Sequence, residues 1–194
     1  MLFRSIGGLG LTIKTAFDHI QPGTPALAPE NPIIIGAGPL VGTDVPSASR
    51  IYAVSKLPAT STIGWCGAGG VVFGAMMKTA GLDQIIIEGR SDTPVYLKII
   101  DDHVELCPAE SLWGAGISST CRQLKNTLPA PAGVLTIGQA GENRISFAMA
   151  SVDGVATLGR GGLGAVLGAK KLKAILVQGS QGVTVADPDR KSVV

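Results

Sequence analysis

The chain has 194 residues and a formal net charge of +2 at pH 7, and it is rich in glycine (27 residues) but only 15% charged. With 45% hydrophobic residues and a mean hydropathy of +0.36, it is not a disordered chain, and so much glycine excludes a helical coiled coil. The small net charge, without a basic run, excludes an electrostatic surface for nucleic acid, and the low charge fits a piece of a larger protein or a homo-oligomer.

The first half of the chain is predicted to combine short buried strands with two helices. Glycines at 7, 8 and 10 open a helix that runs to residue 19, and a proline-containing extended loop follows at 21–32. Apolar or β-branched runs closed by glycine or a polar residue predict strands at 33–35, 50–55 and 85–87. Between the last two strands, we expect a glycine-started helix over 69–80.

The second half repeats this mixture after a hairpin. The hairpin pairs 95–101 with 103–106 and turns at Asp101 and Asp102. The elements expected after it are a polar helix at 118–127, strands at 134–137 and 144–151, a glycine-started helix at 161–172 and a strand at 174–177.

The two halves contain an internal repeat. The first copy reads IGAGP (35–39), RIYAVS (50–55), GAGGVVFGAMMK (67–78) and IIIEG (85–89). The second copy reads IGQAG (137–141), RISFAMAS (144–151), GRGGLGAVLGAKK (159–171) and AILVQG (174–179). Repeated order at this spacing indicates duplicated structural units, so we predict an α+β fold: a pseudo-two-fold duplicated, β-rich domain with short helices.

Each copy places a G-x-G-G segment directly before a predicted helix. Backbone N–H groups at a helix start bind anions, and glycine lets the backbone approach a ligand closely. Arg160 lies within the second segment, while Arg50 and Arg144 begin the matching predicted strands, and an arginine adds bidentate contacts to phosphate. The segments therefore predict a phosphate site, with tight turns and solvated arginines as the structural alternative.

Other kinds of site have weaker support. The run IIIGAGPLVG (33–42) approaches a dinucleotide fingerprint, but its third glycine comes one residue late and no acidic residue stands near the expected position. His19 and His103 are the only histidines, and no catalytic triad or metal-ligand spacing is visible. We therefore assign no catalytic residue, and interpret Glu142 as a residue of a turn.

Cysteine usage and apolar run length bear on location. Cys66, Cys107 and Cys121 have no paired-ligand spacing and are interpreted as reduced, buried side chains, which indicates a cytoplasmic protein. The most apolar stretch, 65–77, is shorter than the roughly 20 residues that span a membrane. The ends 2–5 and 189–192 can be back-translated into overlapping pieces of one short DNA word, so we expect one incomplete domain over 6–188, with non-native ends at 1–5 and 189–194.

The chain resembles the N-terminal domain of the tungsten-containing aldehyde ferredoxin oxidoreductases. The matching segments are IGGLGL (6–11), NPIIIGAGPLVGTDVPSASR (31–50), GAGGVVFGAMMKTAGLDQIIIEG (67–89), DTPVYLKIIDDHVEL (92–106), TIGQAGEN (136–143) and LGRGGLGAVLGAKKLKAILVQG (158–179). The resemblance covers nearly all of 6–180 in family order. The family's first strands and its two C-terminal domains are not matched.

The resemblance implies a saddle of two β-rich halves on which a bis-pterin cofactor sits. Two pterins hold one tungsten, with molybdenum as the other metal of this type, and magnesium bridges their phosphates. By position, the implied cofactor-binding residues are Arg50, Gly67, Ala68, Gly69, Ala156, Thr157, Leu158, Gly159, Arg160 and Gly161. The backbone carbonyls of Gly67 and Thr157 occupy the positions that face magnesium. Gly67 stands where the family often has asparagine, and Ala156 where some members have arginine.

The family implies the remaining expectations for the parent protein. It would oxidise a small aldehyde to a carboxylic acid and pass electrons through a 4Fe-4S cluster, held by the absent domains, to ferredoxin or a similar acceptor. The fragment by itself would be inactive. The three cysteines are not assigned to the cluster. Two alternatives stay open: a non-enzymatic module that binds a phosphate-bearing ligand, and a flavin or nicotinamide domain.

Overall fold

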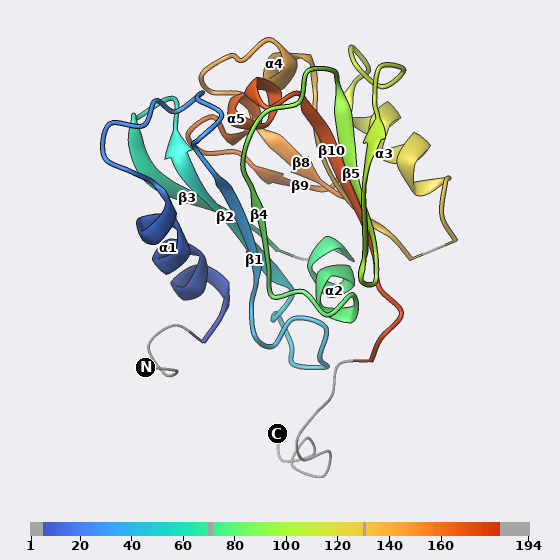
Figure 1. Cartoon of the computed structure of the whole chain (residues 1–194). Helices are drawn as coiled ribbons and strands as arrows, with labels where there is room; N and C mark the ends of the chain where they lie inside the picture. Colours follow the sequence, from blue (N-terminus) through green and yellow to red (C-terminus); the bar gives the residue numbers. More distant parts are fainter. Residues whose placement is uncertain (1–5, 70–71, 130, 183–194) are drawn as a thin grey trace.

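The computed structural model describes residues 6–69, 72–129 and 131–182, and Figure 1 shows the arrangement of its two sheets. The expected non-native ends at 1–5 and 189–194 lie outside these residues, as do residues 183–188 of the expected domain. Every strand pairing in the described chain is antiparallel apart from one. The mixed α/β content agrees with the expected fold class, and the antiparallel order around 33–42 excludes the doubly wound parallel sheet of a dinucleotide domain.

The first sheet has the strand order β3-β2-β1-β4. Its strands are β1 (Ile33–Ala37), β2 (Arg50–Leu57), β3 (Thr62–Gly69) and β4 (Gln84–Ile87). Helix α1 (Gly8–His19) covers one face of β1 and β2, where Ala16 packs with Ile34 and Val54. Helix α2 (Val72–Thr79) connects β3 to β4.

The second sheet has the order β6-β5-β10-β7-β8-β9. A hairpin of β5 (Val95–Ile100) and β6 (His103–Pro108) leads through α3 (Ile117–Lys125) to β7 (Gly133–Ile137). The chain then continues through α4 (Gln139–Glu142), β8 (Ala150–Val152), β9 (Ala156–Leu158), α5 (Leu163–Ala169) and β10 (Leu172–Gln178). Strands β10 and β5 form the one parallel pair.

The strand order of the first sheet recurs inside the second. Read from the β9 edge, the second sheet runs β9-β8-β7-β10 before it reaches β5, which matches β3-β2-β1-β4. We call β1–β4 with α2 the first unit, and β7–β10 with α4 and α5 the second unit. In each unit a helix joins the third strand to the fourth, and another helix (α1 or α3) precedes the first strand.

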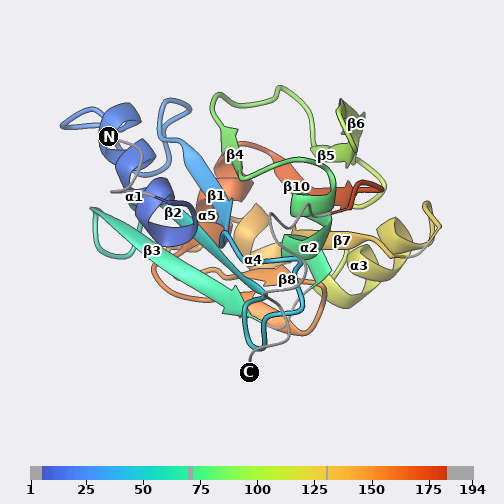
Figure 2. The same ribbon diagram turned by 90° about the horizontal axis from the view of Figure 1, so that it is seen from below.

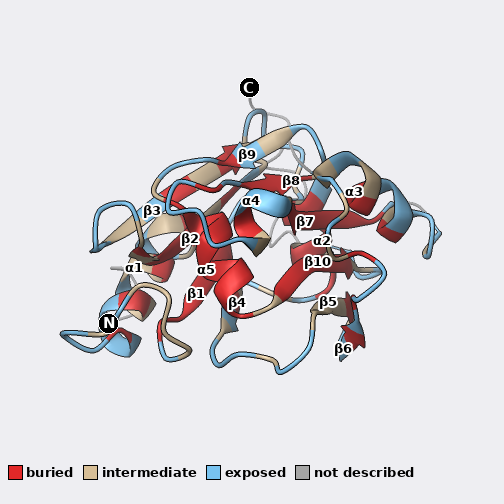
Figure 3. Ribbon diagram, turned by 90° about the horizontal axis from the view of Figure 1, so that it is seen from above, coloured by how far each residue is buried: buried red, intermediate tan, exposed pale blue. Residues whose placement is uncertain are grey.

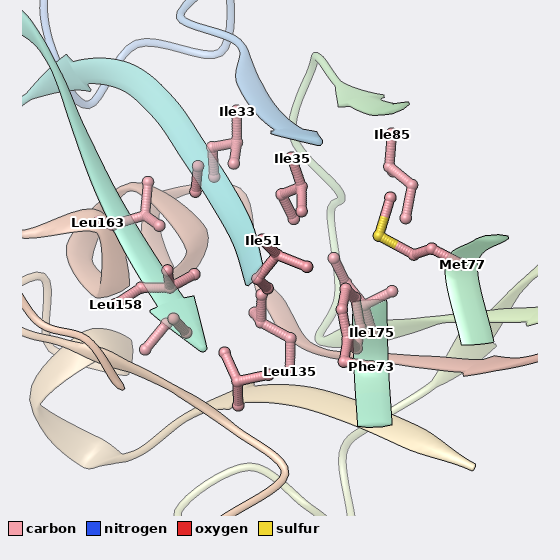
Figure 4. Close-up of a cluster of buried hydrophobic side chains, with 14 of the residues drawn as sticks. Ile33, Ile35, Ile51, Phe73, Met77, Ile85, Leu135, Leu158, Leu163 and Ile175 are labelled. Atoms are coloured by element: carbon pink, nitrogen blue, oxygen red, sulfur yellow. The ribbon is translucent and has the colours of Figure 1, made fainter. Parts of the chain in front are cut away.

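One hydrophobic core joins the two sheets. It combines side chains of the first unit, such as Ile35, Ile51 and Phe73, with Leu135 and Ile175 of the second (Figure 4). Helix α2 contacts β7 and β10, and helix α5 contacts β2, so each helix packs on a strand of the other unit. Figure 2 shows α2 against β10 from below, and in Figure 3 the buried residues follow the facing strands and α5.

Most predicted elements are confirmed, and two of them are predicted with the wrong start. Where a helix is predicted at 69–80, Gly69 still belongs to β3 and α2 spans Val72–Thr79, while residues 70 and 71 lie outside the described residues. The strand predicted from Arg144 begins at Ala150, because 144–149 form turns after α4. Strands β3 and β9 and helix α4 had no predicted counterpart. In the described chain, none of the helices is both long and apolar enough to cross a bilayer.

Candidate functional site

The first glycine segment lies on the outer strand of the first sheet. Arg50 pairs in register with Gly69, and Tyr52 pairs with Gly67. A Cβ at Gly69 would lie 3.4 Å from Arg50 Nε, and one at Gly67 would lie 3.1 Å from Tyr52 Cδ1. The arginine side chain therefore lies directly over backbone that carries no side chain of its own.

The alternation of β3 separates this outer face from the core. Cys66 and Ala68 are buried among the core residues, while Gly67 and Gly69 point the opposite way, as the two-residue period of a strand requires. Gly67–Gly69 were expected to form a loop before a helix. They instead form the end of β3, because their ladder to Arg50, Ile51 and Tyr52 keeps the backbone extended.

The second glycine segment directly follows a strand. Ala156, Thr157 and Leu158 form β9 and pair with Val152, Ser151 and Ala150, which corrects the expected loop. Leu158 is fully buried in the core, whereas Thr157, Gly159 and Arg160 are exposed. A Cβ at Gly159 would lie 3.4 Å from Thr157 Oγ1. The hydroxyl of Thr157 and the backbone of Gly159 therefore lie next to each other at the surface.

The structure brings the two strands that carry these segments together. β3 and β9 are the terminal strands of their sheets, and they contact each other. The Ala59 N–H, in the turn before β3, donates to the carbonyl of Gly161, after β9, over 3.2 Å. A terminal strand presents unpaired N–H and C=O groups along its outer edge. The edge of β3 thus adjoins that of β9, and Gly161, which follows β9, contacts the turn before β3.

The helix starts contribute fewer free donors than the sequence predicts. At the second residue of α2, the Phe73 N–H donates to Asp153 Oδ2 over 2.9 Å. At the equivalent residue of α5, the Gly164 N–H donates to the Ala148 carbonyl over 2.9 Å. These two donors are already used, so an anion would be bound by the strand edges and connecting segments rather than by these helix starts.

The three candidate arginines differ in position. Arg50 and Arg160 are exposed at the two glycine segments. Arg144 was expected to begin a strand, but it lies in a turn with φ 57° and donates its N–H to the Gly141 carbonyl. Among the ion pairs of the described residues, none engages these arginines. Arg50 and Arg160 therefore keep their charge available at the site.

Asp153 is a site-related residue that the sequence analysis missed. It lies in the turn between β8 and β9, where Asp153 and Gly154 have φ of 57° and 76°, as a type I′ turn requires. Its side chain is 4% exposed and lies 3.2 Å from Lys125 Nζ. The Asp-Gly pair between apolar residues is a strong hairpin signal, and it was the signal available for finding this turn.

The remaining titratable candidates have structural roles. All three cysteines are unpaired thiols and buried, and burial raises the pKa of Cys66 to about 12, which leaves a poor nucleophile at neutral pH. His19 Nδ1 lies 2.9 Å from Glu88, and His103 is exposed at the start of β6. No group of three or more metal-ligating side chains occurs within the described ranges.

Glu142 holds the second unit together rather than lining a site. Its carboxylate accepts the Gly114 N–H and pairs with the fully buried ammonium of Lys173. Lys173 also donates to the Ala115 carbonyl over 2.8 Å. The turn predicted at Glu142 is wrong, because the residue ends α4 and its carboxylate makes a buried ion pair.

A cleft of about 800 Å³ lies elsewhere, between β4 and the β5–β6 hairpin. Its walls include Ile87, Leu97 and Leu106, and Lys170 reaches it from the end of α5. Lys170 is 3% exposed and donates to the carbonyls of Pro29 and Gly89, and burial lowers its pKa to about 8. None of the implied cofactor-binding residues lines this cleft. The cleft volume and the residues implied by the resemblance therefore indicate different locations for a ligand. We favour the adjoining strand edges, because exposed arginines and glycine backbone lie together there.

The residues at the strand edges fit an anionic, phosphate-bearing group. Arg50 and Arg160 supply positive charge, Thr157 supplies a hydroxyl, and Gly67, Gly69 and Gly159 leave the backbone accessible. Backbone carbonyls on a free edge also suit a hard cation such as magnesium.

Comparisons with known proteins match this chain over nearly its whole length. The family model for the aldehyde ferredoxin oxidoreductase N-terminal domain matches residues 1–179. Tungsten-containing aldehyde ferredoxin oxidoreductases of Thermococcus kodakarensis and Pyrococcus furiosus are 43% and 41% identical over 97% of the chain. The chain spans only 31% of the length of each of these relatives.

Two further relatives have different names. The aliphatic sulfonate oxidoreductase WOR-like subunit of Pyrococcus furiosus is 36% identical over 79% of the chain, which spans 26% of that protein. The solved active-site complex BamBC of benzoyl coenzyme A reductase, in complex with 1,5-dienoyl-CoA, matches with a TM-score of 0.92 and 38% identity. That match covers 97% of this chain and 29% of the solved chain.

Proposed function

The chain belongs to the aldehyde ferredoxin oxidoreductase family by its N-terminal domain, and on that premise we propose that it is the cofactor-holding part of a tungsten-containing aldehyde oxidoreductase. The observation that carries this proposal is the meeting of the β3 and β9 edges, with Arg50 lying over Gly69. The shared strand order of the two units supports a pseudo-two-fold arrangement, which suits a ligand with two similar halves.

We infer that the group held there is a bis-pterin that carries tungsten, with molybdenum as the alternative metal, and that its phosphates are bridged by magnesium. Arg50, Gly67, Ala68 and Gly69 would hold one phosphorylated arm. The second arm would be held by residues of the other unit, namely Ala156, Thr157, Leu158, Gly159, Arg160 and Gly161. When bound, this group supplies two-electron redox chemistry at its metal.

The roles of this chain's own residues follow from their contacts. The guanidinium groups of Arg50 and Arg160 neutralise phosphate charge and can donate bidentate hydrogen bonds. The Gly67 and Gly69 backbone permits close approach, and the carbonyls of Gly67 and Thr157 suit magnesium. The chain orients and retains the group, and we assign it no catalytic acid, base or nucleophile.

For the parent protein we propose oxidation of an aldehyde to a carboxylic acid. The reaction takes up one water and releases two protons and two electrons. The electrons would pass through a 4Fe-4S cluster, held outside this chain, to ferredoxin or a similar acceptor in the cytoplasm. The domain is shared with proteins named for sulfonate and benzoyl-CoA chemistry, so the substrate would be selected mainly outside it, and the chain alone would be inactive.

The test is to produce the full-length parent with tungstate and with molybdate. We expect about one metal and two pterins per polypeptide, and aldehyde-dependent reduction of ferredoxin. A parent that binds phosphate-bearing ligands but retains neither metal nor pterin would favour the non-enzymatic binding module. A metal-loaded parent that reduces ferredoxin with a sulfonate, but not with aldehydes, would contradict the proposed substrate class.

A further inference from the structure

We propose that Asp153 is a positioning residue that ties the two glycine segments together, so that both hold the cofactor in one fixed geometry. This inference rests on the proposed function, because it assigns a role at the same site. Asp153 is not among the residues that the resemblance implies as cofactor contacts. The argument depends on which elements its carboxylate joins.

The carboxylate of Asp153 joins three elements of the fold. Oδ2 accepts the Phe73 N–H at the start of α2, and Oδ1 accepts the Val134 N–H of β7, both over 2.9 Å. Lys125 Nζ, at the end of α3, lies 3.2 Å from Oδ1. Because Asp153 itself precedes β9, a single buried side chain connects the strand of the second segment with the helix that follows the first.

The backbone around this contact is packed too closely to absorb a shift. A Cβ at Gly133 would lie 2.4 Å from Phe73 Cα, so the start of α2 rests directly on β7. The Asp153 N–H also donates to the Val134 carbonyl over 2.7 Å. Interiors packed this tightly transmit a displacement rather than absorbing it. A change at Asp153 should therefore move both α2 and the β8–β9 turn.

The opposite turn makes the reciprocal contact. In the turn between β2 and β3, the Ala59 N–H donates to the Gly161 carbonyl over 3.2 Å. Gly161 has φ 76°, and a Cβ there would lie 2.3 Å from Leu57 Cδ1. The second glycine segment is thus held by the β2–β3 turn, and the helix that follows the first glycine segment is held by the β8–β9 turn. The two contacts differ in chemistry, since only the Asp153 contact uses an ionised side chain.

The ionised form is what the three partners require. Two N–H donors and one ammonium all point at the two oxygens of Asp153. Asparagine offers one oxygen and an NH₂ group, so one of the two N–H donors would face another donor. Asp153→Asn should therefore release either the start of α2 or the edge of β7 while keeping the size of the side chain.

The test uses the tungsten-loaded parent and two readouts, amide hydrogen exchange and the half-life of bound tungsten and pterin after dilution. For Asp153→Asn we expect exchange in peptides covering 72–79 and 156–169 to rise at least about tenfold, as for loss of a charge-assisted hydrogen bond. We expect the cofactor half-life to fall about tenfold, as for loss of supporting contacts around a metal site. Both readouts are taken where circular dichroism shows every variant folded.

Asp101→Asn is the matched control. Asp101 also lies in a hairpin turn with positive φ, at 52°, and its carboxylate accepts the Ser180 N–H over 2.7 Å. It touches neither glycine segment, so we expect both readouts to stay as in the unmodified protein. Lys125→Met is a second control: it removes the cation but leaves both N–H bonds of Asp153 in place, so we expect less than a twofold change.

Gly154→Ala keeps the proposal falsifiable if Asp153→Asn does not fold. It strains the turn that presents Asp153, because Gly154 has φ 76°, and it leaves the carboxylate intact. We expect both readouts to move in the same direction by a smaller factor.

Each failure has a distinct signature. Unchanged cofactor retention in a folded Asp153→Asn or Gly154→Ala variant would overturn the role of Asp153, even if exchange rises. A parent that never retains tungsten or pterin would instead refute the proposed function.

Discussion

The two units have the same strand order, but their surroundings differ. In the second unit, β10 is flanked by β5, and all seven residues of α5 are buried. In the first unit, β4 is the last strand of its sheet, and it borders the wide cleft. The fourth strand and the connecting helix are therefore more fully buried in the second unit than in the first. We therefore expect the two units to differ in stability although they share one strand order.

The first test of this comparison uses the close packing of α5 on α4. A Cβ at Gly168 would lie 1.8 Å from the backbone oxygen of Gly141. For Gly168→Ala we expect a loss of about 3 kcal/mol or more in the free energy of unfolding, at or above the top of the usual range for overpacking. Urea denaturation or the soluble yield measures this effect.

Gly74→Ala in α2 is the matched change in the first unit. Its Cβ would meet the Ile51 Cγ2 atom at 2.7 Å, a side-chain atom that can move. We expect a loss of about 1–2 kcal/mol. Equal losses for the two variants would mean that α5 is not packed more rigidly than α2.

The fourth strands of the two units allow a second comparison. Ile175 of β10 is fully buried between β5 and β7, whereas Ile86 of β4 is 42% exposed. Ile175→Ala should destabilise the protein by about 2–4 kcal/mol, because it leaves a cavity in the core, and Ile86→Ala by less than about 1 kcal/mol. Chemical denaturation of both variants decides the point; an Ile86→Ala loss as large as that of Ile175→Ala would show that β4 is covered.

Two equivalent lysines give the units a different dependence on pH. Lys78 pairs with Asp83, but Lys170 has carbonyl partners and a pKa lowered to about 8 from 10.5. The folded protein then binds fewer protons than the unfolded chain between pH 8 and 10.5, so Lys170 makes the free energy of unfolding rise through that window. The full rise is on the order of 3 kcal/mol.

Lys170→Met should remove that rise, and Lys78→Met should leave it. Unfolding midpoints at pH 7.5, 9 and 10 measure the difference between each variant and the unmodified protein. The difference is needed because Cys66, whose pKa is raised to about 12, lowers stability as the pH rises above about 9. A parallel pH profile for Lys170→Met would contradict the role of burial.

The smallest effect on stability is expected for Arg50 and Arg144, which occupy equivalent positions in the sequence repeat. Both are exposed, so Arg50→Gln and Arg144→Gln should each change the free energy of unfolding by less than about 0.5 kcal/mol. Only Arg50 lies over a glycine segment, so only Arg50→Gln should weaken cofactor retention. Equal retention in both variants of the tungsten-loaded parent would remove Arg50 from the site.

The fold was predictable where apolar runs were closed by glycine. The isoleucines of β1 and β4 and the hairpin turn at Asp101 gave unambiguous signals. Strand β3 gave none, because three of its eight residues are glycine. Those glycines are extended because they pair with β2, a long-range cause that local propensity does not encode.

The candidate site was predictable in part for the same reason. The repeat pointed to the two glycine segments; the structure places Gly67–Gly69 on β3 and Gly159–Gly161 directly after β9, and these two strands contact each other. The equivalence of Arg50 and Arg144 failed, because β8 has only three residues and Arg144 falls in the preceding turn. The contact of Asp153 with Phe73 joins residues 80 positions apart, and no local pattern indicates such a pairing.

The central claim is that the edges of β3 and β9 together hold one tungsten-bearing cofactor. Anomalous X-ray scattering at a tungsten absorption edge, from crystals of the full-length parent, locates the metal directly. We expect one strong peak flanked by Gly67–Gly69 on one side and Thr157–Gly161 on the other. A peak beside only one of these segments, or in the cleft near Lys170, would contradict the claim.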